Sequence, residues 1–426
     1  MSVSLTEKDK KILSGRTGAA ARLAMSILVR MAEVYDAPRL MDVTQAHIDG
    51  CALMCDSGLE FAETLVARGA RVSVPTTLNM IPLDLQNWRK QNVPEEFAKK
   101  AGRIASSYLA MGCVPTWTCA PYQGYLTPRF GQQIAWGESN AIVYANSVLG
   151  ARTNRYGDYM DICAAITGRV PESGLHLKQN RKGQVLLRLA NIAPQLLRDD
   201  TIYVALGHLM GGLVQERIPV IEGLPLNATG DQLKSLGAAA ASSGAVGLFH
   251  AIGVTPEAAT LEEAFQGGSA KEVIDVNYTD LRKAWSELST VEEGARLDAI
   301  VLGCPHFSYG EFQQLARCIE DEKGRSLHRG VRVLVLTSQT SYALLQRGNF
   351  IDTLLDFGVE IALDTCVFHS PIISPHTKVI MTNSGKFAYY APGELGVQVA
   401  FGGMKDCIHS AIEGVVSWEK SIWKRY

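Results

Sequence analysis

The chain has 426 residues, of which 47% are hydrophobic and 20% are charged, and Lys+Arg 41 nearly balances Asp+Glu 43 to give a net charge of −2. This composition excludes wholesale disorder, and without a basic run interleaved with aromatic residues we expect no nucleic-acid partner. No stretch of about 18 apolar residues predicts a membrane span. Because no nucleic-acid partner is expected, a substrate should be a small molecule. The start, MSVSLTEKDKKILSG, lacks the apolar core of a signal peptide. The nine cysteines therefore indicate reduced thiols in a cytoplasmic protein.

The first half of the chain alternates expected helices with short strands. Residues 5–34 carry apolar residues at helical spacing, with Thr6 as a plausible N-cap. A second helix is expected to end at Gly69, and ARVSVPTTLN is expected to contain a strand. Residues 96–112 then read as another helix. This alternation is typical of α/β architecture.

The middle of the chain is rich in small residues. The run TIYVALGHLMGGLV, at residues 201–214, reads as strand-like and is followed by loop-rich sequence. Residues 232–258 alternate small residues with glycines, which permits a close approach between backbones.

Residues 298–366 carry the clearest pattern in the chain. Three near-continuous apolar runs, DAIVLG, VRVLVLTS and VEIALDT, are separated by helical stretches, as in a β-α-β-α-β unit of buried parallel strands. Cys304 is expected just past the end of the first strand, and Cys366 just past the end of the third. The carboxyl ends of parallel strands are where α/β proteins place ligand sites.

Three cysteines share a setting that suits a metal ligand. Cys119, Cys304 and Cys366 each lie in loop-like sequence beside a proline or threonine. Three thiolates can hold an iron–sulfur cluster and leave one iron for a substrate oxygen. A structural zinc site is disfavoured because the chain has no Cys-x-x-Cys pair. Other cysteines, in helix-like runs, are expected to be core thiols: Cys163, Cys318 and Cys407.

Each of these cysteines also has other readings. A small buried apolar residue is the ordinary role of a free cysteine. Cys119 is also a candidate nucleophile, if the fold brings His306 or His369 close enough to act as its base. For the two histidines, the simpler expectation is a loop residue whose ring nitrogens are hydrogen-bonded and take no part in catalysis.

Two further segments carry candidate ligand-binding residues. Glu138 and Ser139 lie in GESNA on the approach to a helix, whose free N–H groups suit an anionic oxygen, although plain helix capping is an equal alternative. Lys386 lies in SGKFAYYAPG, expected as a glycine-rich aromatic loop, where it is a plausible clamp for a substrate carboxylate. A solvated lysine is the alternative for that residue.

Several segments together carry a resemblance to a known family. They are VPTTLN, TWTCAPY, AWGESNAIVYANSVLGARTNR, AAITGRVPESGLH, ASSGAVGLFHAIGVTPEA, GCPHFS, DTC and TNSGKFAYYAPG. In this combination and order the chain resembles the aconitase X family, large catalytic part, from about residue 5 to about residue 415. The resemblance implies an aconitase-like fold with several α/β domains and mainly parallel sheets around a central cleft. We expect an N-terminal α/β region at 1–290, with more than one subdomain, and a β-α-β-α-β domain at 291–426.

The resemblance also implies the members of the site. The cluster ligands would be Cys119, Cys304 and Cys366, with a [2Fe-2S] cluster favoured and a [3Fe-4S] or [4Fe-4S] cluster also compatible with three cysteines. No catalytic base is expected in this chain, because the family places it on a serine of a separate or fused small subunit. The implied substrate pocket comprises Gly50, Cys51, Ala52, Asn79, Met80, Glu138, Ser139 and Lys386.

The expected substrate is inferred from two positions of this pocket at which the chain differs from archaeal members of the family. Archaeal members, which dehydrate mevalonate 5-phosphate, tend to read Gly-Val-Ser and Asn-Pro where this chain has Gly-Cys-Ala at residues 50–52 and Asn-Met at residues 79–80. The missing hydroxyl at Ala52 removes a hydrogen bond to phosphate and favours the bacterial type of reaction, dehydration of cis-3-hydroxy-L-proline to Δ1-pyrroline-2-carboxylate. Mevalonate-5-phosphate dehydratase large subunit is the alternative enzyme, and a non-catalytic binding or regulatory subunit is the alternative of another class.

Overall fold

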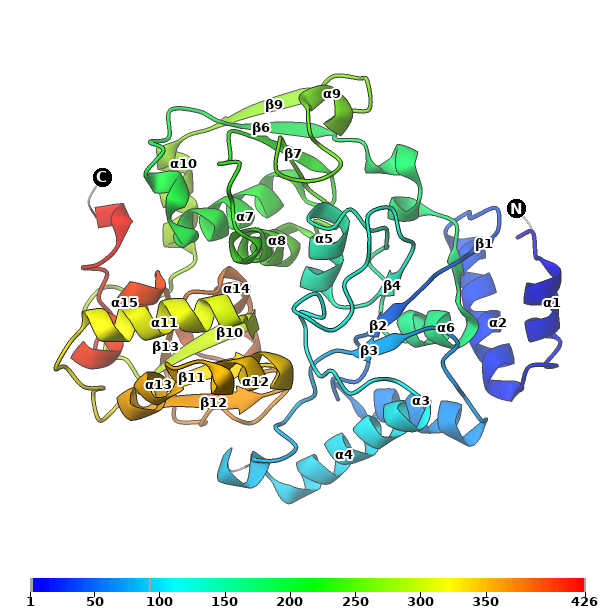
Figure 1. Cartoon of the computed structure of the whole chain (residues 1–426), viewed down its shortest axis with the longest axis horizontal. Helices are drawn as coiled ribbons and strands as arrows, with labels where there is room; N and C mark the ends of the chain where they lie inside the picture. The colour runs from blue at the N-terminus through cyan, green and yellow to red at the C-terminus, as the bar shows by residue number, and fades with distance from the viewer. Residues whose placement is uncertain (1–2, 92, 425–426) are drawn as a thin grey trace. The chain divides into compact units, whose positions relative to one another are not determined.

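The computed structural model describes residues 3–91 and 93–424, which fold into two compact units (Figure 1). Unit 1 comprises Met1–Lys182 and Asp364–Pro371, and unit 2 comprises Gly183–Leu363 and Ile372–Tyr426. The short segment from Asp364 therefore belongs to unit 1 although the chain on both sides of it belongs to unit 2. None of the described helices is long and apolar enough to cross a membrane.

Unit 1 is built on a small parallel sheet, in the strand order β3-β2-β4. Its strands are β2 (Ala46–Ile48), β3 (Thr76–Leu78) and β4 (Ala135–Trp136), and β1 (Leu40–Asp42) pairs antiparallel with β5 (Arg169–Pro171). The helices are α1 (Glu7–Leu13), α2 (Ala19–Val34), α3 (Asp56–Ala67), α4 (Glu95–Ala110), α5 (Ser139–Ser147) and α6 (Met160–Thr167), with 3-10 turns η1 (Trp88–Gln91), η2 (Gly174–His176) and η3 (Lys178–Arg181). Apolar side chains of α2, α3, α4 and α6 join the sheet in one core.

The expected N-terminal helix forms as two helices. Thr6 caps α1 as predicted, because its side chain accepts a hydrogen bond from Asp9 N at 3.2 Å. The chain between α1 and α2 contains Gly15 and Gly18 with φ of 80° and 108°, a conformation that interrupts a right-handed helix. The expected end near Gly69 is confirmed, since α3 stops at Ala67 and Gly69 has φ of 77°.

Unit 2 contains two parallel sheets, β12-β11-β10-β13-β14 and β8-β7-β6-β9. The strands are β6 (Val185–Leu189), β7 (Pro219–Glu222), β8 (His250–Ala251), β9 (Glu272–Val276), β10 (Ala299–Phe307), β11 (Arg332–Thr337), β12 (Val359–Leu363), β13 (Val379–Thr382) and β14 (Gln398–Phe401). The helices are α7 (Asp200–Val214), α8 (Gly230–Gly244), α9 (Leu261–Ala264), α10 (Tyr278–Glu287), α11 (Tyr309–Asp321), α12 (Gln339–Arg347), α13 (Ile351–Phe357), α14 (Gly385–Glu394) and α15 (Met404–Glu413), with 3-10 turns η4 (Leu196–Arg198) and η5 (Ile422–Lys424).

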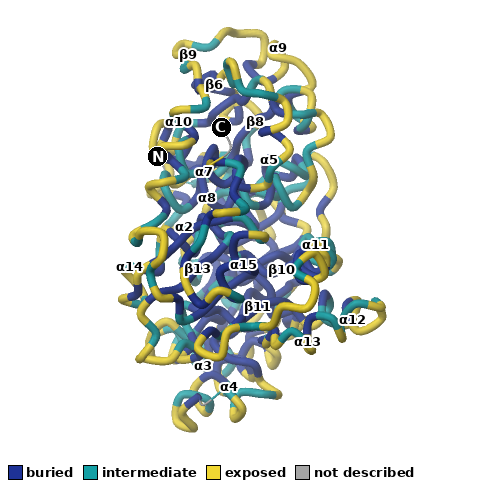
Figure 2. Tube along the Cα trace, turned by 90° about the vertical axis from the view of Figure 1, so that its left-hand side faces the viewer, coloured by how far each residue is buried: buried dark blue, intermediate teal, exposed yellow. Residues whose placement is uncertain are grey.

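The β-α-β-α-β unit predicted from the apolar runs is confirmed. Strands β10, β11 and β12 are neighbours and parallel, with Val333 in register with Ile300 on one side and Val359 on the other. Strands β10 and β11 run through the buried part of the unit (Figure 2). Such strands read as continuous apolar runs because both of their faces are covered.

Three local predictions were wrong, and each for a physical reason. Residues 201–214 form helix α7, because a helix that is apolar all round cannot be told from a buried strand by its pattern. SGKFAYYAPG forms helix α14, capped by Ser384, whose side chain accepts from Phe387 N at 3.0 Å. Cys304 lies within β10 and not past its end, at an irregularity where regular pairing with β11 stops after Leu302 and resumes at Phe307.

Helices α7 and α8 approach closely, as the small residues predicted. A Cβ added at Gly207 would overlap the Leu236 carbonyl oxygen and lie 3.0 Å from Ala239 Cβ. We expect Gly207→Ala to lower the unfolding free energy by about 1–3 kcal/mol, because two packed backbones would have to separate. Gly212→Ala in the same helix meets no atom within 4 Å and is the control, expected to stabilise by about 0.5–1 kcal/mol. Denaturant unfolding of the two variants checks this, and equal effects would contradict it.

Candidate functional site

The candidate pocket residues of unit 1 all follow the carboxyl ends of its parallel strands. His47 is in register with both Thr77 and Trp136, so the three strands leave the sheet at the same level. The residues that come next lie together along one edge of the sheet. They are Gly50, Cys51 and Ala52 after β2, Asn79 and Met80 after β3, and Glu138 and Ser139 after β4.

The loop after β2 contacts the backbone of Asn79 and Met80, which follow β3. Cys51 is completely buried, and its Sγ lies 3.3 Å from the carbonyl oxygen of Asn79 and 3.8 Å from that of Met80. Burial, reinforced by the nearby Asp49 carboxylate, raises the pKa of the Cys51 thiol well above its ordinary value. Cys51 is therefore a neutral packing group that joins two strand ends.

Glu138 caps helix α5. Its Oε2 accepts a hydrogen bond from Ala141 N at 2.8 Å, and the side chain is only 2% exposed. Asn140 Nδ2 donates both to the Glu138 carboxylate and to the carbonyl oxygen of Cys119, the latter at 2.9 Å. The capping alternative is thus confirmed for Glu138, and the cap also fixes the backbone of the Cys119 loop.

Cys119 and Cys366 lie together in unit 1. With Met80 they form one small cluster of buried residues, against which Phe368 packs. The segment that carries Cys366 is joined to the loop after β3 by backbone hydrogen bonds, from Cys366 N to Ile81 O at 3.1 Å and from Ile81 N to Asp364 O at 2.9 Å. Two of the three cysteines singled out in the sequence are thereby brought side by side.

Cys304 lines a small cavity in unit 2 together with Lys386. The cavity, of about 20 Å³, is also lined by Gly303, Pro305 and the first residues of α14. Ser384 Oγ donates a hydrogen bond to the Cys304 carbonyl oxygen, so the N-terminus of α14 holds this part of β10. Gly303 has φ of 93°, and a side chain there would overlap the Leu336 backbone, so glycine is required beside Cys304.

A buried charge network supports this cavity and was not foreseen. Lys234 of α8 forms ion pairs with Glu311 of α11 and, at 3.1 Å, with Asp231. Burial lowers and the two carboxylates raise the pKa of Lys234, with a net increase, while burial raises the pKa of Glu311 to about 7. Ser308, the cap of α11, donates to both acids at 2.8 Å. In the sequence, the Ser-x-x-Glu capping box of Ser308 and Glu311 was the signal that could have pointed to this network.

A second buried acid, Asp161 on α6, was also missed. Its Oδ2 accepts from Asp49 N at 2.6 Å, and its Oδ1 accepts from Ile162 N at 2.6 Å. Burial raises the pKa of Asp161 to about 7, and hydrogen bonds from the backbone oppose this. A Cβ added at Gly137 would lie 2.7 Å from Asp161 Oδ2, so this carboxylate lies between the ends of β2 and β4.

The raised pKa of Asp161 gives a pH-dependent contribution to stability. Since the folded state holds the proton more tightly than the unfolded state, the contribution is present at low pH and is lost as pH rises from about 4 to about 7. The unfolding free energy of the wild type minus that of Asp161→Asn should therefore fall across this range, by at most about 1.4 kcal/mol per pH unit. Denaturant unfolding at several pH values measures the slope. A difference that rises with pH would contradict the assignment.

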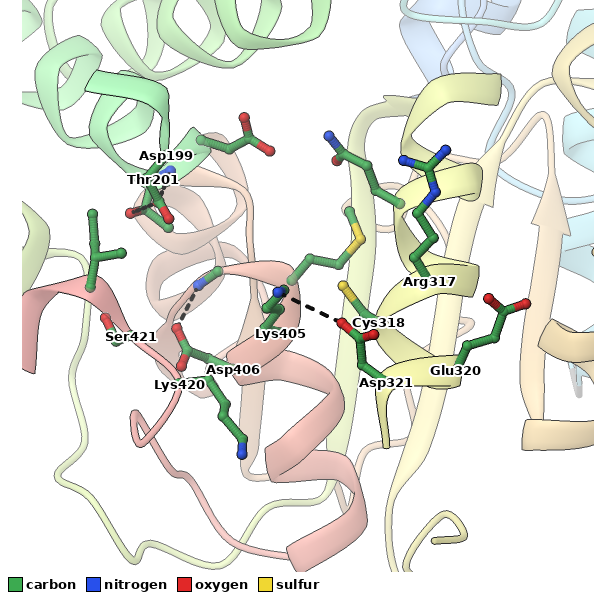
Figure 3. Close-up of a pocket in the computed structure, with 15 residues that line it drawn as sticks. Asp199, Thr201, Arg317, Cys318, Glu320, Asp321, Lys405, Asp406, Lys420 and Ser421 are labelled. Carbon is green, nitrogen blue, oxygen red and sulfur yellow. Dashed lines mark hydrogen bonds and ion pairs between the residues drawn. The ribbon is translucent and has the colours of Figure 1, made fainter. Parts of the chain in front are cut away.

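Another cavity of unit 2, of about 420 Å³, contains none of the predicted site residues (Figure 3). It is bordered by the N-termini of α7 and α15, where Asp199 and Asp406 act as capping residues. Burial raises the pKa of Asp406 to about 7, and its Oδ2 accepts from Gly403 N at 3.0 Å. Helix capping accounts for Asp199 and Asp406 in this cavity, and Asp321 forms an ion pair with Lys405 at 3.7 Å.

Cysteines and polar side chains that follow the carboxyl ends of parallel strands are typical of a ligand-binding α/β protein, and enzymes of this class place their active sites at such strand ends. Sequence profiles described as aconitase X first, second and third domain match residues 2–179, 183–286 and 297–413. The chain therefore belongs to the aconitase X family, as the sequence motifs predicted.

Known relatives agree with this assignment. The chain is 43% identical over 417 residues to a cis-3-hydroxy-L-proline dehydratase of Hypocrea jecorina (97% of this chain, 69% of the relative) and 45% identical over 409 residues to one of Pseudomonas aeruginosa (95% and 69%). It is 36% identical to the phosphomevalonate dehydratase large subunit of Methanocaldococcus jannaschii (95% and 99%). The crystal structure of Thermococcus kodakaraensis aconitase X in its holo-form matches with a TM-score of 0.86 at 33% identity, covering 96% of this chain and all of that one, which confirms the predicted aconitase-like α/β fold.

Proposed function

We propose that this chain is the catalytic part of a hydro-lyase that converts cis-3-hydroxy-L-proline to Δ1-pyrroline-2-carboxylate. The observation that carries the proposal is the 43–45% identity to two dehydratases of that name, against 36% for the phosphomevalonate enzyme of Methanocaldococcus jannaschii. The pocket chemistry supports it. Ala52 is buried and offers no hydroxyl, and the Cys51 thiol is directed to backbone carbonyls, so neither side chain favours a phosphate group.

Cys119, Cys304 and Cys366 are proposed as ligands of an iron–sulfur cluster. The proximity of Cys119 and Cys366 supports this, and so does the partial exposure of Cys304. Within residues 3–91 and 93–424, no set of three or more His, Cys, Asp or Glu side chains forms a metal-binding group, so the third ligand rests on the family resemblance. When bound, such a cluster supplies a Lewis-acidic iron that makes the 3-hydroxyl a better leaving group. We favour the [2Fe-2S] form.

The chain's own residues are proposed to bind the substrate and stabilise charge. Loss of the C2 proton and of the C3 hydroxyl gives an enamine and water, and the enamine tautomerises to Δ1-pyrroline-2-carboxylate. Negative charge develops on the carboxylate as the proton leaves C2. The Lys386 ammonium and the N–H groups at the start of α5, next to Ser139, are the groups proposed to stabilise it.

The proton acceptor is proposed to come from a small subunit of the same family. The Methanocaldococcus jannaschii and Methanothermobacter thermautotrophicus relatives are named large subunits, and this chain covers 99% and 96% of their lengths. Residues 291–426 are proposed as a separate domain within the chain. The match of the third-domain profile to residues 297–413 supports this division.

The test compares the two family substrates. The chain is co-expressed with its small subunit, and kcat/KM is measured for cis-3-hydroxy-L-proline and for mevalonate 5-phosphate. We expect turnover of the imino acid and none of the phosphate ester. The reverse result would assign the alternative activity, and turnover of neither by a cluster-loaded complex would favour a binding or regulatory subunit.

A further inference from the structure

Asp49 lies at the centre of the proposed substrate edge, although no sequence pattern singled it out. It follows the last residue of β2, the middle strand of the sheet of unit 1. On the β3 side, Asn79 Nδ2 donates a hydrogen bond to Asp49 Oδ1. On the β4 side, a Cβ added at Gly137 would lie only 3.0 Å from Asp49 Cβ. Asp49 is thus flanked by the proposed pocket segments of both outer strands.

The conformation of Asp49 is fixed by its surroundings. Its backbone N–H donates to Asp161 Oδ2 at 2.6 Å, and Asp161 is completely buried. Its carboxylate is oriented by Asn79. Asp49 is a partly exposed residue, unlike Asp161. A carboxylate that is held in place and still reachable is pre-organised to bind a cation.

Glu138, the carboxylate that follows β4, is less suited to that role. Glu138 is 2% exposed, and its oxygens accept hydrogen bonds from Ala141 N and, at 3.3 Å, from Ser139 Oγ. The remaining proposed pocket residues of unit 1 carry no charge: Gly50, Cys51, Ala52, Asn79, Met80 and Ser139. The edge therefore has an acidic character. Asp158, near Gly50, is also partly exposed, but Asp49 is the partly exposed acid that directly follows a strand of the sheet.

We propose that Asp49 binds the ring ammonium of the substrate and is the residue that selects imino acids. This inference rests on the proposed function and assigns the residue that binds the nitrogen of the substrate. At neutral pH cis-3-hydroxy-L-proline carries a secondary ammonium next to the carbon that loses its proton. A charge-assisted hydrogen bond from this ammonium to Asp49 would be stronger than one between neutral groups. The same carboxylate repels a phosphate ester that has no amine. Asp49 would therefore raise the affinity for the imino acid and lower the affinity for the phosphate ester.

The test measures equilibrium binding of two unreactive ligands to the cluster-loaded complex. L-proline has the ring ammonium but no 3-hydroxyl, and cyclopentanecarboxylate lacks the nitrogen. We expect the wild type to bind L-proline about 10- to 100-fold more tightly than cyclopentanecarboxylate, and Asp49→Asn to lose most of this preference. The KM for cis-3-hydroxy-L-proline should rise by a similar factor in Asp49→Asn, with iron content and Tm kept.

Each outcome separates this role from a structural one. Equal weakening of both ligands in Asp49→Asn, or a wild type that does not distinguish them, would overturn the proposal. If Asp49→Asn does not fold, Asp49→Ser, which removes the charge with less bulk, gives the same comparison, and Asp49→Glu, which keeps the charge, is expected to retain the preference for L-proline. Wild-type complex that fails to turn over cis-3-hydroxy-L-proline would defeat the proposed function alone, because ligand preference is measured without turnover.

Discussion

Replacing Cys119, Cys304 or Cys366 by serine is expected to abolish dehydratase activity and to lower the iron content of the purified protein. A serine hydroxyl is a poor substitute for a thiolate as an iron ligand, so each variant would lose a proposed ligand. Cys119 and Cys366 should behave alike, because they occupy the same buried cluster in unit 1. Iron analysis and the visible absorption spectrum measure the loss directly and do not depend on turnover.

Cys55→Ser is the matched control for this series. Cys55 is a free and exposed cysteine of unit 1, before α3, and lies outside the proposed ligand set. Its variant should keep full iron and full activity. A protein that binds iron normally after loss of Cys119 or Cys366 would disprove their proposed role, and loss of activity with iron retained would instead favour Cys119 as a nucleophile.

Lys234→Met is expected to destabilise unit 2 by about 3–5 kcal/mol. The substitution keeps the length of the side chain but leaves Glu311 and Asp231 without their buried cation. Removing one partner of a buried ion pair is costly because the remaining charge stays away from water. Both acids also hold Ser308, the cap of α11, so the damage should extend to the wall of the Cys304 cavity. Denaturant unfolding measures the loss.

The double variant Lys234→Met with Glu311→Gln tests the cause. Removing one of the uncompensated carboxylates should restore a large part of the lost stability, so the two substitutions should be strongly non-additive. Lys283→Met is the control, since Lys283 is an exposed lysine on α10 with a 3.9 Å contact to Glu287. It should change the unfolding free energy by less than about 1 kcal/mol. Simple additivity in the double variant would show that Lys234 acts through packing and not through charge.

The fold was predictable where sequence pattern and burial agree. Strands β10, β11 and β12 are continuous apolar runs because the sheet is covered on both faces, and Cys366 follows β12 as expected. Helix α7 was mistaken for a strand because ten of its residues are buried and it has no polar face. Helix α14 was missed because Gly385 and Pro392 within it are ordinarily signs of a loop.

The sequence allowed the members of the candidate site to be named, but not the contacts between them. The positions of the cysteines came from loop context and family resemblance, since no spacing rule joins residues so far apart in the chain. Only the i,i+3 spacing to Asp231 is local to Lys234, because its other partner, Glu311, is 77 residues away. Asp49 and Asp161 meet only through parallel strand pairing and the packing of α6. Such pairs depend on tertiary contacts, which a single sequence does not reveal.

The central claim is that the chain, with its small subunit, removes water from cis-3-hydroxy-L-proline. The most direct measurement is ¹H NMR of the substrate incubated with the cluster-loaded wild-type complex, in parallel with the Cys119→Ser complex. The account predicts loss of the C2 and C3 proton signals and the appearance of Δ1-pyrroline-2-carboxylate with the wild type alone. An unchanged substrate spectrum with a complex of full iron content, or equal product formation by the Cys119→Ser complex, would contradict it.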